Sequence, residues 1–319
     1  MNRLIALLPS FVDRRVRVLA WLSLVFQIAL IGTGGAVRLT GSGLGCPTWP
    51  SCTDSSFVST PEMGIHGIIE FANRMLTFVL ALIVIAAFLS VVRYWRARRD
   101  LFVITLLQGL SIPLQAVIGG ITVLTGLNPY IVGLHFVISI LLVVNATIFV
   151  YRAYRGRRGP LRIAPLWALA TAHIASLFVA ITVIVGILTT GSGPHAGDAK
   201  TPRNGLDAEL LQHLHSWPAY VLLGLTVVLV IGAIAQKLPM RGWVLTLLGV
   251  EALQVVVGLT QARLGLPPLL VGIHMVLAGL LVAAMTAVVL SMRSSSASSQ
   301  SADAAPVGES ATAESTAAR

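Results

Sequence analysis

Charged residues are scarce in this chain of 319 residues: Asp, Glu, Lys and Arg make up only 11% of it, whereas 56% is hydrophobic. The mean hydropathy of +0.87 excludes an ordinary soluble domain. Apolar runs near the ~20 residues that cross a bilayer occur at roughly 18–37, 65–92, 100–124, 131–151, 163–189, 209–235, 241–262 and 269–292. The sequence therefore predicts an all-α integral membrane protein with eight transmembrane helices.

Acidic residues are the scarcer charge, 12 against 22 Lys and Arg, which leaves a net charge of +10. The basic residues cluster before the first run and after the second, fourth, sixth and eighth runs. Only five lie on the other side: Arg38, Arg74, Lys200, Arg203 and Arg263. By the positive-inside bias, we expect both termini to be cytoplasmic in a multi-pass protein of the cell membrane. The charge thus reports topology and does not indicate nucleic-acid binding.

Cysteine is nearly absent, since only Cys46 and Cys52 occur, both in "GLGCPTWPSC". The predicted topology puts this loop on the outer side of the membrane, where disulfides persist. We therefore expect the two cysteines to be bridged. Two roles stay open: a staple for the loop, or a redox-active pair, because a short ring between exposed cysteines can be reducible.

The chain repeats itself, because "LQAVIGGITVLTGLNPYIVGLHF" from Leu114 matches "LQVVVGLTQARLGLPPLLVGIHM" from Leu253 at an offset of 139. Weaker matches join 39–43 to 189–193, and "IIEFANRMLTF" to "LLQHLHSWPAY" at an offset of 142. Each half holds an even number of spans, so both enter the membrane in the same direction. We expect two parallel-repeated four-helix bundles, 18–152 and 163–292, joined by a basic cytoplasmic linker, 153–162. Residues 1–17 would form a cytoplasmic segment, and the Ser- and Ala-rich residues 293–319 a disordered tail.

Four histidines, His66, His135, His215 and His274, lie near the outer ends of the even-numbered spans. They divide as two per bundle, so each bundle can hold a planar ligand between two imidazoles, for which heme iron is the obvious candidate. Zinc would require three or four ligands in one site. His213 is a rival to His215, and the offset of 142 favours His215.

A polar stripe opens the second span. His66, Glu70 and Asn73 are spaced by four and three residues, so they share one face of a helix. We expect this face to line the first bundle's site, with His66 opposite His135. Arg74 lies off the stripe and suits a carboxylate such as a heme propionate. A simple ion pair between Glu70 and Arg74 is the alternative.

With its duplicated bundles, its "CPTWPSC" loop, "IIEFANR" and its ordered histidines, the chain resembles the heme A synthase family over roughly residues 15–292. It reads Glu-x-x-Asn-Arg where many members read Glu-x-x-His-Arg, as in an actinobacterial-like variant. The resemblance implies oxidation of the C8 methyl group of heme O to the formyl group of heme A, for the assembly of cytochrome oxidase. Heme O synthase as donor, oxidase assembly factors and a homo-oligomer are the partners it implies.

The resemblance also implies residue roles. The heme O substrate would lie in the first bundle at His135, with Glu70 as the catalytic acidic residue. His215 and His274 would bind a resident heme b in the second bundle. The main alternative is a diheme b-type electron-transfer protein, but such a carrier needs hemes near opposite faces of the membrane. From the residues alone, we expect Glu251, the other deep carboxylate, to be hydrogen-bonded to packing neighbours such as Gln254.

Overall fold

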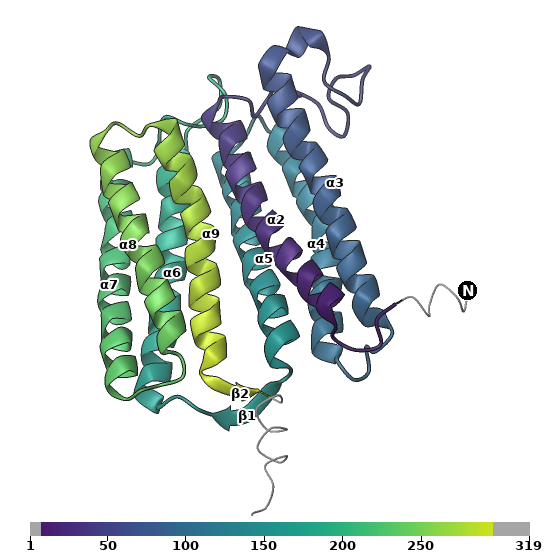
Figure 1. The fold of residues 1–319 in the computed structure, drawn as a ribbon. Helices are drawn as coiled ribbons and strands as arrows, with labels where there is room; N and C mark the ends of the chain where they lie inside the picture. Colours follow the sequence, from purple (N-terminus) through teal and green to yellow (C-terminus); the bar gives the residue numbers. More distant parts are fainter. Residues whose placement is uncertain (1–7, 296–319) are drawn as a thin grey trace, which may run out of the picture.

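The computed structural model describes residues 8–295, and this part of the chain is almost entirely helical (Figure 1). Eight of its helices are long and apolar enough to cross a membrane. They are α2 (Arg14–Leu39), α3 (Gly64–Val92), α4 (Arg99–Leu124), α5 (Pro129–Arg155), α6 (Leu166–Ser192), α7 (Ala208–Ala235), α8 (Arg241–Arg263) and α9 (Pro268–Ser291). A short 3-10 turn, η1 (Pro61–Met63), leads into α3. The eight predicted spans are confirmed, with ends that differ by a few residues.

Local sequence signals set the helix ends. Asp13 caps α2 by accepting a hydrogen bond from the backbone N–H of Val16, so this helix begins before the first apolar run. Asn128 caps α5 in the same way and is followed by Pro129, whose missing N–H costs nothing at the first helical position. Residues 1–7 of the predicted cytoplasmic segment lie outside the described residues.

The two halves of the chain lie side by side, α2–α5 next to α6–α9 (Figure 1). Helix α9 contacts both α2 and α5, so these three helices form the middle of the molecule. Phe149 and Val143 of α5 and Leu281 and Val288 of α9 are buried in the shared core there. The division into two separate bundles stays a prediction, because this core is continuous across the two halves.

The turns after α4 and α8 have the same backbone. Gly126 and Leu127 have φ values of 62° and 60°, and Gly265 and Leu266 have 73° and 63°. Positive φ favours glycine, which explains why both turns begin with one. The backbone N–H of the leucine reaches back to the helix in each turn, over 2.7 Å in the first and 2.8 Å in the second. The repeated sequence therefore folds into a repeated turn.

A small sheet was not predicted. Strand β1 (Arg158–Arg162) pairs antiparallel with β2 (Arg293–Ser295), in a register that joins Arg158 to Ser295 and Arg162 to Arg293. It ties the linker between the halves to the residues that follow α9. The rest of the predicted disordered tail, 296–319, lies outside the described residues.

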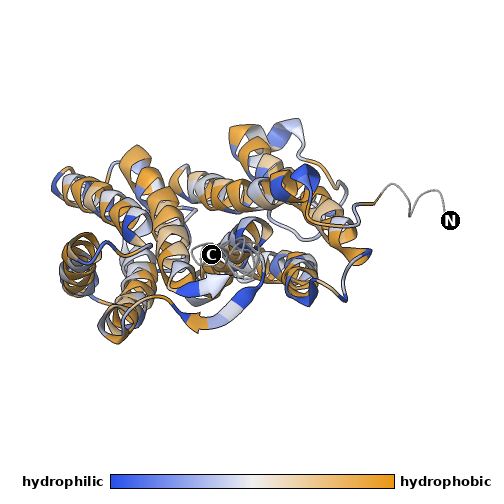
Figure 2. Ribbon diagram, turned by 60° about the horizontal axis from the view of Figure 1, so that its bottom comes forward, coloured by the Kyte–Doolittle hydropathy of each residue, from blue (hydrophilic) through white to orange (hydrophobic). Residues whose placement is uncertain are grey.

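The outer surface of the helices is apolar. Leu82, Leu110, Val228 and Ile231 are all more than half exposed, and hydrophobic residues predominate along the helices (Figure 2). Side chains of this kind on the outside of a helix bundle are suited to lipid. The structure is that of a multi-pass membrane protein.

Candidate functional site

Two imidazoles face each other between α7 and α9. The ring centroids of His215 and His274 lie 6.1 Å apart, with 69° between the ring planes. His215 Nδ1 lies 3.0 Å from the carbonyl oxygen of Thr182 in α6. Because a carbonyl oxygen only accepts, Nδ1 donates this hydrogen bond and Nε2 keeps the lone pair that can bind a metal. A Cβ at Gly186 would lie 2.8 Å from Cε1 of His215, so this glycine leaves the ring its space.

The repeat gives His135 and His274 matching surroundings. A Cβ at Gly119 would lie 3.4 Å from Cε1 of His135, and one at Gly258 would lie 3.1 Å from Cε1 of His274. The Nδ1 atoms of both histidines are buried and have no hydrogen-bond partner among the described residues. A buried polar nitrogen without a hydrogen-bond partner destabilises the folded state by about 1–3 kcal/mol. Both rings are thus suited to interacting with a group that the protein itself does not supply.

A glutamine fixes the backbone beneath each of these histidines. Gln115 Nε2 donates to the carbonyl oxygen of His135 over 3.2 Å, and Gln254 Nε2 donates to that of His274 over the same distance. Ser139 adds a second donor to the carbonyl of His135, at 2.9 Å. The repeated Gln and His positions therefore form one structural unit that occurs twice.

The first half differs from the second at the position on α3 that corresponds to His215 on α7. At the offset of 142, Asn73 takes the place of His215, and its Oδ1 accepts a hydrogen bond from Thr33 Oγ1 over 2.7 Å. His66, two turns earlier on α3, is exposed, and its Nδ1 lies 2.9 Å from Ser42 Oγ. Its predicted role as a second ligand in the first half stays a prediction.

Glu70 and Arg74 hold the outer loop. Arg74 Nη2 donates to Glu70 Oε1 over 2.6 Å, and Glu70 Oε2 accepts the backbone N–H of Cys46, also over 2.6 Å. Arg74 Nη2 donates further to the carbonyl oxygens of Cys46 and Thr48, at 3.0 and 3.2 Å. The ion pair that the sequence offered as the alternative is present, and it is part of a larger clamp on the loop.

The predicted disulfide between Cys46 and Cys52 is confirmed, and both cysteines are fully buried. The indole ring of Trp49 lies against Gly120 of α4, in the space that a Cβ there would need. The loop therefore folds back over the end of the first half at which α4 ends and α3 begins. Glycine at this position permits the close approach.

Two expectations about neighbouring polar residues are resolved. His213 is exposed on α7, whereas His215 is the residue that faces His274. Glu251 Oε1 accepts a hydrogen bond from Thr226 Oγ1 over 2.8 Å. The expected bond from Glu251 to Gln254 is wrong, because the amide nitrogen of Gln254 is directed at the carbonyl of its own half's histidine.

The residues present fit a heme better than a zinc ion. Two imidazole nitrogens at about 2 Å from a shared metal put the ring centres about 6 Å apart, close to the 6.1 Å observed. Among residues 8–295, no group of three or more His, Cys, Asp or Glu side chains could hold a metal ion. Two imidazoles from facing helices are a usual axial pair for heme iron.

A comparison with protein families matches residues 17–286 to the cytochrome oxidase assembly proteins of the COX15-CtaA family. The chain belongs to this family. The match spans all of α3 to α8 and most of α2 and α9.

Relatives in the COX15-CtaA family carry the name heme A synthase. The chain is 30% identical to one from Methylobacterium radiotolerans over 243 residues, 64% of either chain. It is 37% identical to one from Bacillus pumilus over 122 residues, covering 37% of this chain and 38% of the relative. It is 32% identical to one from Listeria welshimeri over 127 residues. The chain thus spans about two fifths of the length of that last relative, 41%.

Proposed function

We propose that this member of the COX15-CtaA family is a heme A synthase, which oxidises the C8 methyl group of heme O to the formyl group of heme A. The product would serve the assembly of a terminal oxidase. The observation that carries the proposal is the facing pair His215 and His274, which fits a resident heme in the second half. The relatives named heme A synthase support the same reaction.

We assign heme b to the second half, where His215 and His274 would hold it. Bound there, this heme supplies one-electron redox chemistry. The carbonyl of Thr182 holds the His215 ring in one orientation and leaves Nε2 as the nitrogen that can bind a metal. Gln254 holds the backbone of the other ligand in place. The protein's task at this site is to position the two nitrogens before the cofactor arrives.

The substrate, heme O, occupies the first half in this proposal, with His135 as a ligand to its iron. His66 and Asn73 line the site from α3, where Asn73 marks the Glu-x-x-Asn-Arg variant of the family's motif. We assign His66 as the second ligand of the substrate iron. Its imidazole, which is hydrogen-bonded to Ser42 in the structure, would leave that partner when the substrate binds. Arg74 recognises a propionate of the substrate, because a guanidinium is suited to a carboxylate.

Glu70 is the catalytic carboxylate of the proposal. It accepts a proton from the carbon being oxidised, or stabilises positive charge that develops there. Its side chain is 7% exposed, so it acts in a site from which water is largely excluded. The clamp with Arg74 and the N–H of Cys46 fixes the position of the carboxylate. The disulfide loop therefore orients the catalytic group as well as covering the site.

We place the protein in the cell membrane with both termini in the cytoplasm and both heme sites toward the outer face, as the distribution of basic residues favours. Heme O synthase is the donor of the substrate, and the assembly factors of the terminal oxidase receive the product. A homo-oligomer is consistent with the large apolar surface of α3 and α7.

A diheme electron-transfer protein is the less favoured function. It would need two equivalent bis-imidazole sites, whereas Asn73 stands in the first half where His215 stands in the second. It would also have no use for Glu70, a buried carboxylate whose matching position in the second half, at the offset of 142, is Gln212.

Expression in a host that makes heme O but has lost its own heme A-forming enzyme tests the proposal. Wild-type protein is expected to give heme A in membrane extracts, as measured by chromatography and mass. His135→Ala is expected to give none, while its folded yield stays normal. Heme O that persists unchanged with the wild-type protein would contradict the proposed activity.

A further inference from the structure

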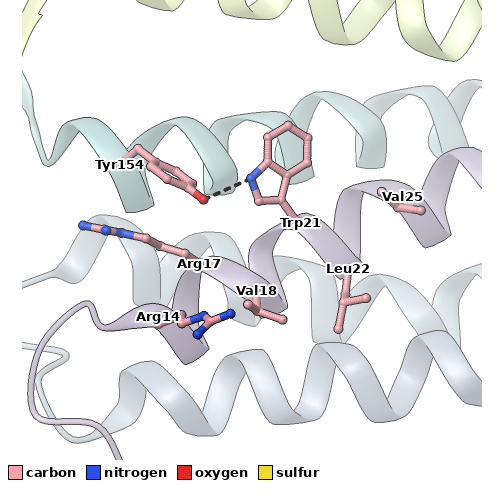
Figure 3. Close-up of a pocket in the computed structure, with 7 residues that line it drawn as sticks. All are labelled: Arg14, Arg17, Val18, Trp21, Leu22, Val25 and Tyr154. Carbon is pink, nitrogen blue, oxygen red and sulfur yellow. Dashed lines mark hydrogen bonds between the residues drawn. The ribbon is translucent and has the colours of Figure 1, made fainter.

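A pocket of about 380 Å³ lies between the start of α2 and the end of α5. It is at the opposite end of these helices from the histidine site, and its lining combines two arginines, a tryptophan, a tyrosine and three aliphatic side chains (Figure 3). No Asp or Glu side chain of residues 8–295 lines it. The proposed function assigns no task to this pocket.

Arg17 is held in place from one side only. Its Nε donates to the carbonyl oxygen of Ala153 over 3.3 Å, and its Cζ lies 5.0 Å from the centre of the Tyr154 ring. Tyr154 is itself fixed, because its hydroxyl oxygen accepts a hydrogen bond from Trp21 Nε1 over 3.2 Å (Figure 3). The two terminal nitrogens of Arg17 make no hydrogen bond with the described residues. The guanidinium is thus preorganised to offer a pair of donors.

Arg14 adds a second positive charge one turn earlier on the same helix. Its guanidinium makes no ion pair or hydrogen bond with residues 8–295. Asp13, which precedes Arg14 in the sequence, makes other contacts: Oδ1 accepts the N–H of Val16 at 3.1 Å, and Oδ2 lies 3.6 Å from Arg15 Nε. Neither Arg14 nor Arg17 is paired with this carboxylate, and two cations repel each other, so an anion between them would be stabilised.

The pocket continues as an apolar stripe toward the middle of the membrane. Val18, Leu22 and Val25 follow the arginines along one face of α2, and all three are exposed. The eleven steps along the helix from Arg14 to Val25 rise about 16 Å, at 1.5 Å per step. Half of the hydrocarbon core of a bilayer is about 15 Å thick. Charge, aromatic groups and apolar surface therefore succeed one another over the length of one lipid leaflet.

We propose that this pocket binds an anionic glycerophospholipid. Its phosphate headgroup would lie between Arg14 and Arg17, its glycerol region at Trp21 and Tyr154, and an acyl chain along the stripe. Basic pockets between transmembrane helices recognise such headgroups, and aromatic side chains mark the same interface. A free phosphate ion would use only the arginines and leave the stripe uncovered. The proposal rests on the transmembrane placement of the helices and not on the heme chemistry.

Native mass spectrometry of the full chain in detergent tests the site. Dioleoyl phosphatidylglycerol is titrated against the wild-type protein and against Arg14→Gln/Arg17→Gln, and the bound lipid is counted. Each arginine near a headgroup contributes roughly a factor of five, so the double variant is expected to bind about 30-fold more weakly. The matched control is Arg96→Gln/Arg99→Gln, which removes two exposed arginines that stack on Trp95 at another helix end. This control is expected to bind like the wild type.

Tyr154→Leu provides a second variant that keeps both charges but frees Arg17, and it is expected to weaken lipid binding about fivefold. Inorganic phosphate at millimolar concentration is expected not to displace the lipid. Equal binding by wild type and the Arg14 and Arg17 double variant, an equal loss in the control, or displacement by phosphate would each overturn the proposal. Heme content is measured on the same samples, so a failure of the proposed function is seen separately.

Discussion

Glu70→Gln tests the two tasks of a side chain that holds the Cys46–Cys52 loop and is the proposed catalytic carboxylate. In the structure this carboxylate accepts one hydrogen bond from Arg74 and one from the N–H of Cys46, both over 2.6 Å. Glutamine keeps the shape and a neutral acceptor for Cys46. Its amide nitrogen cannot accept from Arg74, so the ion pair is lost.

The size of the effect follows from those two contacts. A hydrogen bond to a charged group contributes about 1.5–3 kcal/mol, and a neutral one about 1 kcal/mol. The two side chains are only 7% and 19% exposed, so solvent screens them weakly. Arg74 retains its bonds to the loop carbonyls, which limits the loss. We expect the loop to be destabilised by about 2 kcal/mol, a factor of roughly 30 in its opening equilibrium.

Two measurements test the Glu70→Gln variant: amide hydrogen exchange and analysis of the bound and produced hemes. We expect the Cys46 amide to exchange roughly 30-fold faster in Glu70→Gln, the resident heme to remain, and heme A to disappear. Thr48→Val is the control, because it removes the bond from Thr48 to the Ser51 carbonyl in the same loop and leaves the carboxylate intact. Normal heme A yield from Glu70→Gln would refute the catalytic role. An unchanged exchange rate would refute the clamp.

Three further predictions concern the imidazoles. His215→Ala is expected to abolish the low-spin reduced-minus-oxidised heme spectrum. The control, His213→Ala, changes an exposed neighbour and is expected to leave the spectrum intact. Equal spectra from the two variants would contradict the assignment of His215 as a ligand. Gly186→Ala puts a methyl group 2.8 Å from the His215 ring and is expected to cost about 1–3 kcal/mol in heme affinity, seen as a right-shifted heme titration. His66→Ala, compared with Asn73→Ala, is expected to change the spin state of bound heme O. If His66→Ala alters neither spin state nor affinity, its imidazole is not a ligand.

The repeat made the second half of the site predictable from sequence. The offset of 142 selects His215 over His213, and the offset of 139 pairs His135 with His274; the structure then brings His215 to His274. The positions of the membrane spans could also be predicted from the sequence, because a lipid-facing helix must be apolar over its whole length.

Contacts through the backbone could not be predicted. The acceptor for His215 is the carbonyl of Thr182, and every residue carries such a group. The N–H that binds Glu70 is likewise a main-chain group, and it lies 24 positions away in sequence. The β1–β2 pair was not predicted for another reason. Its short strands contain arginine and serine and show no alternation of apolar and polar residues.

Extraction of hemes from the purified wild-type chain tests the central claim most directly. Protein is made with and without a supply of heme O, and the extracted hemes are separated and quantified per chain. The account predicts unmodified heme b in both preparations, held by His215 and His274, and heme A only when heme O was supplied. Unmodified heme alone in both preparations, at two per chain, would contradict it and identify an electron carrier.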